Sequence, residues 1–318
     1  IVTSYLPNAA SNFGHDKLPP HEERYDLADE YLEVVYKLWE GSWEEDAVLR
    51  DTKRGIYADP AKVHQINHKG QHFDVVGPHL SEPSPQRTPL LFQAGSSTRG
   101  RRFAAKHAEC VFIVDSRRSL TGLASVISDV RNQAVRNGRS PEDILFFQGL
   151  SPVVGGTEAE AKAKEAEYLD QFSTEGSLAH LSGSIGVDLS SIDLDNPLNT
   201  MDIGAMRGSI KGLIESTPNR TQTFRDLIRT RNAGQFLTGA PEQIADALQD
   251  WQDAGVDGFN LIYSVTPGTF VDFIEGVVPI LQKRGLMQKE YTPGPLREKI
   301  FGDARLTERH PAAEWRIR

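Results

Sequence analysis

The sequence predicts an α/β fold on a parallel sheet, of the (β/α)8-barrel type. Short apolar runs of strand length alternate with longer segments of helical periodicity, and two long insertions interrupt the alternation. Strand, helix and strand in that order form right-handed crossovers between parallel neighbours. Barrel enzymes build their active sites at the carboxyl ends of the strands, where we expect both insertions.

Five strands and six helices are predicted. The strands are short apolar runs at residues 1–4, 89–94, 110–114, 144–150 and 258–263. The helices are residues 22–40, 99–107, 119–137, 158–172, 241–253 and 268–284. In the first helix, apolar side chains recur at helical spacing until Gly41 ends the pattern.

A closed barrel needs eight strands, so about three strand–helix units would have to precede Ile1. A doubly wound open sheet manages with five strands and is the alternative, but no predicted strand leads into the G-x-G-x-x-G turn of a dinucleotide site. The chain also begins inside the β-branched fragment IVTS without a Met. We therefore expect one barrel domain over residues 1–318, with its amino-terminal part absent.

Three segments are expected to lie outside the repeating pattern. Residues 42–88 carry many turn formers, and residues 173–240 are rich in Gly, Ser, Asp and Pro. The second insertion offers few apolar anchors, so we expect it to form a mobile lid. The tail at 291–318 is rich in Pro and Arg and is expected to wrap the surface.

Composition limits the partners. The net charge of −9, from 44 acidic and 35 basic residues, argues against a nucleic-acid partner. The single cysteine, Cys110, rules out a disulfide within the chain and reads as a small buried hydrophobe. No apolar run approaches a membrane span. We expect a soluble, cytoplasmic protein with no membrane partner.

The segment 89–113 holds the clearest functional signal. An apolar strand leads into a turn of small residues, Gly95, Ser96 and Ser97, and a helix begins near Thr98. The free N–H groups and the dipole at a helix start bind phosphate without any lysine. The alternative for the serine pair is that it only caps the helix.

The sequence contains no motif typical of a metal site, a hydrolase or a nucleotide-binding loop. His64, His68, His72 and His79 follow no tight ligand spacing, so we read them as a solvated insertion and expect no metal. No G-x-S-x-G, H-E-x-x-H or Walker sequence occurs. A cofactor must then carry the hard chemistry.

Three long motifs stand out: HEERYDLADEYLEVVYKLWEGSWEEDA at 21–47, EPSPQRTPLLFQAGSSTRGRRFAAKHAECVF at 82–112 and LSGSIGVDLS at 181–190. They resemble the flavin-dependent monooxygenases of the bacterial-luciferase superfamily, in the branch of the nitrilotriacetate, EDTA and dibenzothiophene-sulfone monooxygenases. The resemblance implies a luciferase-like (β/α)8 barrel that begins here at its fourth strand. It also implies reduced FMN (FMNH2) as cofactor and O2 as co-substrate.

The resemblance also assigns site residues. His21, Tyr25 and Ser97 match positions that hold the FMN phosphate, with Gly95 and Ser96 adding backbone donors, and Thr3 lies near the flavin ring. Phe112, His180 and Ser184 are expected on the substrate side, although Ser184 stands where the sulfone-cleaving branch has a histidine. Arg99, Arg101 and Arg102 contribute at most positive electrostatic potential at the phosphate site, and at least two of them are expected to be solvated. No catalytic residue is assigned.

The function implied is a two-component monooxygenase that receives FMNH2 from a separate NAD(P)H:flavin reductase. It oxygenates a small organic molecule, with C–N or C–S cleavage expected, through a C4a-peroxyflavin or a flavin-N5 adduct. A homodimer or homotetramer is expected from the family. The alternative is a non-catalytic flavin-binding barrel or an inactive truncated fragment.

Overall fold

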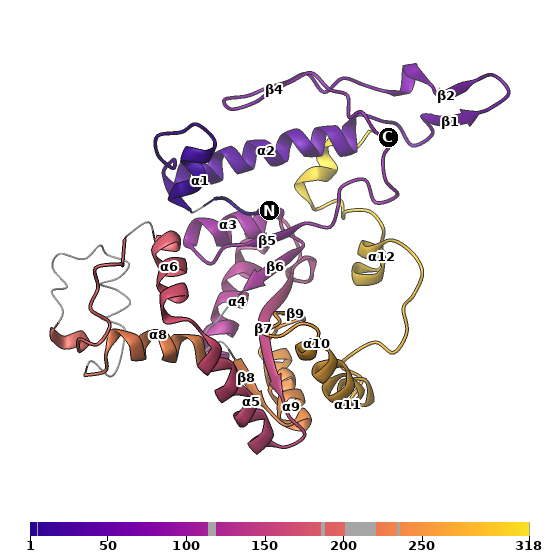
Figure 1. The fold of residues 1–318 in the computed structure, drawn as a ribbon. Coiled ribbons are helices and arrows are strands. Elements are labelled where there is room, and N and C mark those ends of the chain that lie inside the picture. Colours follow the sequence, from indigo (N-terminus) through magenta and orange to yellow (C-terminus); the bar gives the residue numbers. More distant parts are fainter. Residues whose placement is uncertain (5, 114–118, 186–187, 201–220, 234–235, 318) are drawn as a thin grey trace.

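The structure, a computed structural model, describes residues 1–4, 6–113, 119–185, 188–200, 221–233 and 236–317 (Figure 1). Its centre is a sheet of five parallel strands. They are β5 (Phe92–Ala94), β6 (Cys110–Ile113), β7 (Leu145–Val154), β8 (Phe236–Gly239) and β9 (Gly258–Leu261). The order is β5-β6-β7-β8, with β9 also paired to β7.

Strand β7 is the longest strand of the sheet and joins its two halves. Its first residues pair with β6, where Phe112 faces Phe147, and with β9. Its last four residues pair with β8, from Ser151 opposite Phe236 onward. The described strands are fewer than the eight of a closed barrel, so the closed barrel and its starting strand remain predictions.

Four of the five predicted strands are confirmed, and the prediction for residues 1–4 is wrong. Those residues make no ladder, although the amino group of Ile1 donates to the Phe92 carbonyl. One strand of the five-stranded sheet was missed, because β8 lies in the segment predicted to be irregular. A run of four residues leading into a helix gives little periodicity to detect.

All six predicted helices are confirmed. They are α2 (His21–Gly41), α3 (Thr98–His107), α4 (Leu120–Arg136), α5 (Glu158–Gln171), α9 (Pro241–Asp253) and a last helix made of α10 (Gly268–Asp272), a π-helical turn (Phe273–Val277) and α11 (Val278–Lys283). Among the described residues, four further helices were not predicted individually: α1 (Pro7–Asn12), α6 (Thr174–Ile185), α8 (Phe224–Ala233) and α12 (Leu296–Phe301).

The main core lies between one face of the sheet and its helices. Side chains of β6 and β7 such as Val111 and Phe146 are almost fully buried against α3, α4, α9 and α11. Cys110 is buried at the start of β6, and burial raises the pKa of its thiol to about 12, as expected for a packing residue. The opposite face carries half-buried aromatic rings, with Phe92 and Phe147 5.2 Å apart between ring centroids.

The first insertion forms two small antiparallel pairs of its own. They are β1 (Val48–Asp51) with β2 (Ile56–Ala58) and β3 (His68–Lys69) with β4 (Asp74–Val75). Figure 1 shows both pairs beyond α2, away from the five-stranded sheet. Short 3-10 turns lie within the insertions, at Pro60–Lys62 and Leu198–Thr200, and a third joins α4 to β7 at Pro141–Asp143.

The predicted location of the insertions was wrong. Both follow helices, α2 and α5, instead of strand ends. The second insertion also has apolar anchors of its own, because Leu181, Leu189, Leu198, Phe224, Leu227 and Ile228 form a buried cluster. The part of the lid prediction at 186–187, 201–220 and 234–235 lies outside the described residues.

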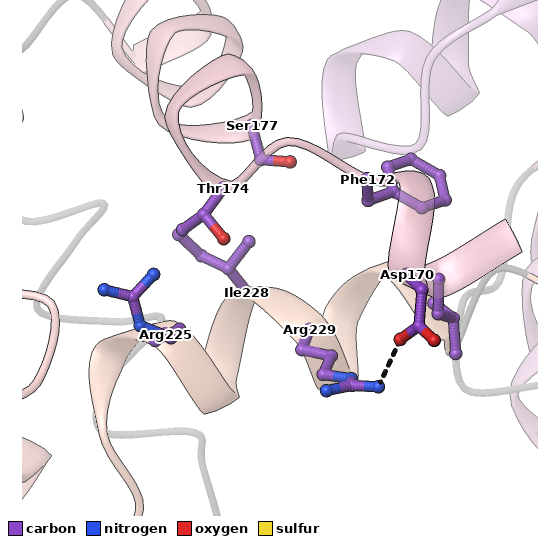
Figure 2. A pocket seen from close by; sticks show the side chains of 8 residues that line it. Asp170, Phe172, Thr174, Ser177, Arg225, Ile228 and Arg229 are labelled. Atoms are coloured by element: carbon purple, nitrogen blue, oxygen red, sulfur yellow. Dashed lines mark hydrogen bonds and ion pairs between the residues drawn. The ribbon is translucent and has the colours of Figure 1, made fainter. Parts of the chain in front are cut away.

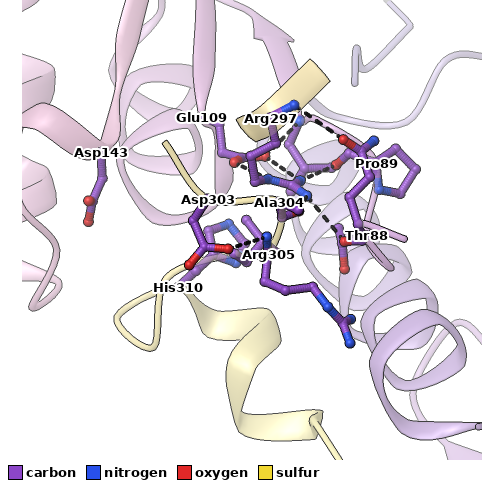
Figure 3. Close-up of polar contacts among 12 residues, drawn as sticks. Thr88, Pro89, Glu109, Asp143, Arg297, Asp303, Ala304, Arg305 and His310 are labelled. Atoms are coloured by element: carbon purple, nitrogen blue, oxygen red, sulfur yellow. Dashed lines mark hydrogen bonds and ion pairs between the residues drawn. The ribbon is translucent and has the colours of Figure 1, made fainter. Parts of the chain in front are cut away.

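The carboxyl-terminal tail contains α12 (Leu296–Phe301) and a 3-10 turn (Pro311–Trp315), and it reaches the core (Figure 3). Arg297 is 1% exposed and donates to both carboxylate oxygens of Glu109, at 2.7 and 2.9 Å. The same guanidinium donates to the Gln86, Pro89 and Ala304 carbonyls. Because Glu109 also accepts from the Leu91 amide, the tail fastens the beginnings of β5 and β6.

Within the described parts of the chain, no helix combines the length and the apolar content needed to cross a bilayer.

Candidate functional site

A cavity of about 610 Å3 lies at the carboxyl ends of β5 and β6. Its lining is Val2, Thr3, Ser4, Leu6, Ala94, Gly95, Ser96, Phe112 and Ile113. The structure therefore brings together four predicted site residues from three segments of the sequence: Thr3, the turn residues Gly95 and Ser96, and Phe112. Parallel register places Ala94 beside Phe112, so the two adjacent strands open onto one space.

The turn beside this cavity starts α3. Ser97 is the N-cap, and its hydroxyl oxygen accepts from the Gly100 amide at 3.0 Å. Ser96 and Ser97 are exposed at the positive end of the helix dipole, and the Ser96 carbonyl accepts from Arg101 Nε at 2.9 Å. The capping interpretation of the serine pair is therefore confirmed for Ser97, and the phosphate interpretation stays a prediction.

His21 meets this turn from the first residue of α2. Its Nε2 lies 3.2 Å from Ser97 Oγ, and its Nδ1 lies 3.0 Å from Glu22 Oε1. A carboxylate only accepts hydrogen bonds, so Nδ1 carries a proton. In the neutral ring Nε2 is then an acceptor for the Ser97 hydroxyl, and in the charged ring both nitrogens donate.

Tyr25 lies one helical turn further on and is 4% exposed. Its ring packs edge-on against His21 and Phe103, at centroid distances of 5.1 and 5.4 Å. A Cβ on Gly95 or on Gly100 would lie 2.7 Å from Tyr25 Oη. The hydroxyl therefore reaches the turn only because both positions are glycines.

The helix arginines do not serve the turn as free cations. Arg99 donates to Asp26 and Asp29 at 3.0 and 2.6 Å, and Arg101 pairs with Asp129 at 2.9 Å. Burial raises the pKa of Asp29, but hydrogen bonds from His107 and Arg99 outweigh it and hold that pKa well below its usual range. The expectation that at least two arginines are solvated was wrong, since Arg102 alone of the three is exposed.

Comparison with known proteins identifies the family. The pattern of the luciferase-like monooxygenases matches residues 1–258. The chain belongs to that family. A dimethyl-sulfide monooxygenase from Hyphomicrobium sulfonivorans is 47% identical, over 99% of this chain and 67% of the relative. A long-chain alkane monooxygenase from Geobacillus thermodenitrificans (strain NG80-2) is 48% identical, over 99% of this chain and 68% of the relative.

A solved structure agrees in fold. Riboflavin lyase (RcaE) with modified FMN and riboflavin matches with a TM-score of 0.82 at 37% identity, over 99% of this chain and 70% of that one. This luciferase-like monooxygenase is therefore a flavin-dependent oxidoreductase with the family's α/β fold and parallel sheet. It spans about two thirds of the length of these relatives.

Two predicted substrate residues lie elsewhere. His180 and Ser184 are on α6, where the Ser184 hydroxyl donates to the His180 carbonyl at 2.8 Å, and neither lines the cavity. Helix α6 contacts α1, which follows the cavity residue Leu6. A smaller cavity of about 170 Å3 lies between α5, α6 and α8 beside the Asp170–Arg229 ion pair, and it contains no predicted site residue (Figure 2).

The histidines of the first insertion are not arranged as a metal site. His64 contacts Glu44, whereas His68 contacts Glu30. Across the described ranges, no group of three or more His, Cys, Asp or Glu could hold a metal ion. Reading all four as solvated was wrong for His68, which is 4% exposed.

Two residues of the site escaped the sequence analysis. Gly100 gives room for Tyr25, and Gln93 is a buried amide on β5 whose Oε1 accepts no hydrogen bond. A polar residue in the middle of the apolar run PLLFQA was the available signal for Gln93. Helix glycines carry no such signal, because the need for Gly100 arises from a side chain 75 residues away.

The donors at the turn fit a phosphate monoester. The Ser97 hydroxyl, the Tyr25 hydroxyl and the His21 imidazole converge there, and the described residues offer Tyr25 Oη no hydrogen-bond partner. The Arg101 guanidinium adds positive charge, because its Nε donates to the Ser96 carbonyl at 2.9 Å. Charge-assisted hydrogen bonds to a dianion are about twice as strong as neutral ones. The cavity next to the turn provides space for a larger group attached to that phosphate.

Proposed function

We propose that this chain binds reduced FMN and oxygenates a small organic substrate with O2. The phosphate would be held at the turn Gly95–Ser97 by His21 and Tyr25, and the ring system would enter the cavity that Thr3 and Phe112 line. The observation that carries the proposal is the position of the 610 Å3 cavity directly beside the capped start of α3.

When bound, reduced FMN supplies the electrons that activate O2. The chain's own residues bind and orient the FMN and shield the reacting atoms from water. Ser97 and Tyr25 donate to the phosphate, and the start of α3 stabilises its charge. Phe112, Ile113 and Leu6 give the cavity an apolar wall, which keeps water away from the reacting atoms.

We infer a neutral, largely apolar substrate. None of the nine lining residues within the described part of the chain carries a charged side chain. Burying a carboxylate there without a partner would cost several kcal/mol. Of the two cleavage reactions expected from the sequence, the lining favours C–S oxidation of a sulfide over C–N oxidation of a polycarboxylated amine. Simple hydroxylation of an alkane fits the same lining, and the relatives at 47% and 48% identity are named for a sulfide and an alkane.

The electrons would come from a separate NAD(P)H:flavin reductase. No strand end in the sequence carries a G-x-G-x-x-G turn for a dinucleotide. We infer that reduced FMN reaches the turn by diffusion or direct transfer from that partner.

The test is oxygen uptake coupled to product. Purified chain, FMN, NADH and a flavin reductase should oxidise a dialkyl sulfide or an alkane with product formed in proportion to O2 consumed. Nitrilotriacetate should give no product. Tight flavin binding without product from any substrate would favour the alternative, a non-catalytic flavin-binding barrel or an inactive truncated fragment.

A further inference from the structure

The amide of Gln93 is a buried polar group without an evident structural task. Gln93 sits opposite Val111 in the parallel register and is 2% exposed. Its Oε1 has no hydrogen-bond partner. An unsatisfied buried acceptor is destabilising, so native proteins rarely keep one unless it serves a ligand or a mechanism.

The side-chain amide of Gln93 and the hydroxyl of Tyr25 both lie close to Gly95. Gln93 Nε2 and Tyr25 Oη are each 2.7 Å from the point that a Cβ on Gly95 would occupy. The two side chains therefore approach the same glycine of the phosphate turn, one from β5 and one from α2. Tyr25 has ring contacts with His21, Phe103 and Arg99, but no described residue bonds its hydroxyl.

An amide and a hydroxyl are suited to exchange roles. The carbonyl end of glutamine only accepts and the amino end only donates, and a half-turn of the amide exchanges the two ends. A tyrosine hydroxyl donates one hydrogen bond and also accepts. Either end of Gln93 can thus satisfy Tyr25, depending on where the phenolic proton points.

We propose that Gln93 is a positioning residue that sets the direction of the Tyr25 hydroxyl for a phosphate monoester. In the described structure Gln93 Oε1 has no partner, and Nε2 is the end that approaches Gly95. Without phosphate, a half-turn of the amide turns Oε1 toward the Tyr25 hydroxyl, which then donates to it. With phosphate at the turn, Tyr25 donates to a phosphate oxygen, and the Gln93 amino group donates to the tyrosine oxygen. Hydrogen bonds in such a chain polarise and strengthen one another. This inference rests on the proposed phosphate site.

The experiment compares FMN with riboflavin, which lacks the phosphate. Gln93→Met keeps the length of the side chain but removes both hydrogen-bonding ends. We expect Gln93→Met to weaken FMN about five- to tenfold, as for the loss of one hydrogen bond, and to leave riboflavin affinity unchanged. In a Tyr25→Phe background the same substitution should have no effect on either flavin.

A matched control separates positioning from packing. Gln148 is also 2% exposed and lies on β7. Gln148→Met should leave the ratio of FMN to riboflavin affinity unchanged. Gln93→Glu, whose ionised side chain cannot donate and repels phosphate, should weaken FMN more than Gln93→Met and serves if the methionine variant fails to fold.

Three results would overturn the proposal. The first is equal weakening of both flavins by Gln93→Met, and the second is an undiminished effect in the Tyr25→Phe background. The third is wild-type protein that binds FMN no tighter than riboflavin, which would remove the phosphate site itself. The first two leave the proposed function intact, so the two failures are distinguishable.

Discussion

Ser97 Oγ lies 3.2 Å from His21 Nε2, although 76 positions separate the two residues. This contact joins the first turn of α2 to the cap of α3. The family resemblance assigns His21 and Ser97 to one phosphate site, and the fold makes the two residues neighbours at the turn beside the cavity.

Loss of two hydroxyls at the turn should weaken FMN strongly. Ser97→Ala combined with Tyr25→Phe is expected to cost about 2 to 4 kcal/mol of FMN binding, since two charge-assisted hydrogen bonds are lost. Fluorescence titration measures this, with riboflavin as the control ligand. Ser97→Ala also removes a helix cap worth about 1 kcal/mol of stability, so only the change specific to FMN counts. Unchanged FMN affinity in the double variant would remove the site assignment.

A methyl group on either glycine should displace Tyr25. In Gly95→Ala and Gly100→Ala the new Cβ would lie 2.7 Å from Tyr25 Oη, and the tyrosine is confined by Phe103. We expect about tenfold weaker FMN binding and a loss of about 1 to 3 kcal/mol in the free energy of unfolding. Gly183→Ala is the control, because nothing lies within 4 Å of its Cβ position. Equal behaviour of all three variants would contradict the close approach.

The tail should be essential for stability. Arg297→Met leaves Glu109 buried without its partner, which is expected to lower the free energy of unfolding by about 3 to 5 kcal/mol in urea denaturation. Arg229→Ala removes an exposed ion pair with Asp170 and should change it by less than about 1 kcal/mol. If both variants lose the same small amount, the tail does not fasten the sheet.

His310 should make the protein sensitive to mild acid. Burial lowers the pKa of His310 to about 3, and its Nδ1 accepts from the Ala312 amide while Nε2 donates to the His107 carbonyl. The unfolded chain therefore binds an extra proton between about pH 6.5 and 3, so stability falls as pH drops through that window. From pH 7 to pH 5 wild type should lose about 2 kcal/mol more than His310→Gln. Urea denaturation at both pH values measures the two losses, and an equal loss in wild type and in His310→Gln would contradict this role of His310.

The sequence predicted the sheet and its helices because those elements repeat with clear periodicity. The prediction failed where the pattern of a few residues does not determine their structure and the rest of the fold does. Residues 1–4 look like a strand but form no ladder with a described strand, although the Ile1 amino group donates to the Phe92 carbonyl. Strand β8 lies in a segment whose composition is mostly polar. Of the site, the turn and its histidine were predictable from motifs. The spatial roles of Gly100 and Gln93 were not, because they depend on where Tyr25 points.

The most direct test of the account is a calorimetric titration of the wild-type chain with FMN and, separately, with riboflavin. If the turn at Gly95–Ser97 holds a phosphate through two charge-assisted hydrogen bonds, FMN should bind about 100-fold tighter than riboflavin. Equal affinities for the two flavins would show that this turn does not bind the phosphate and would contradict the central claim.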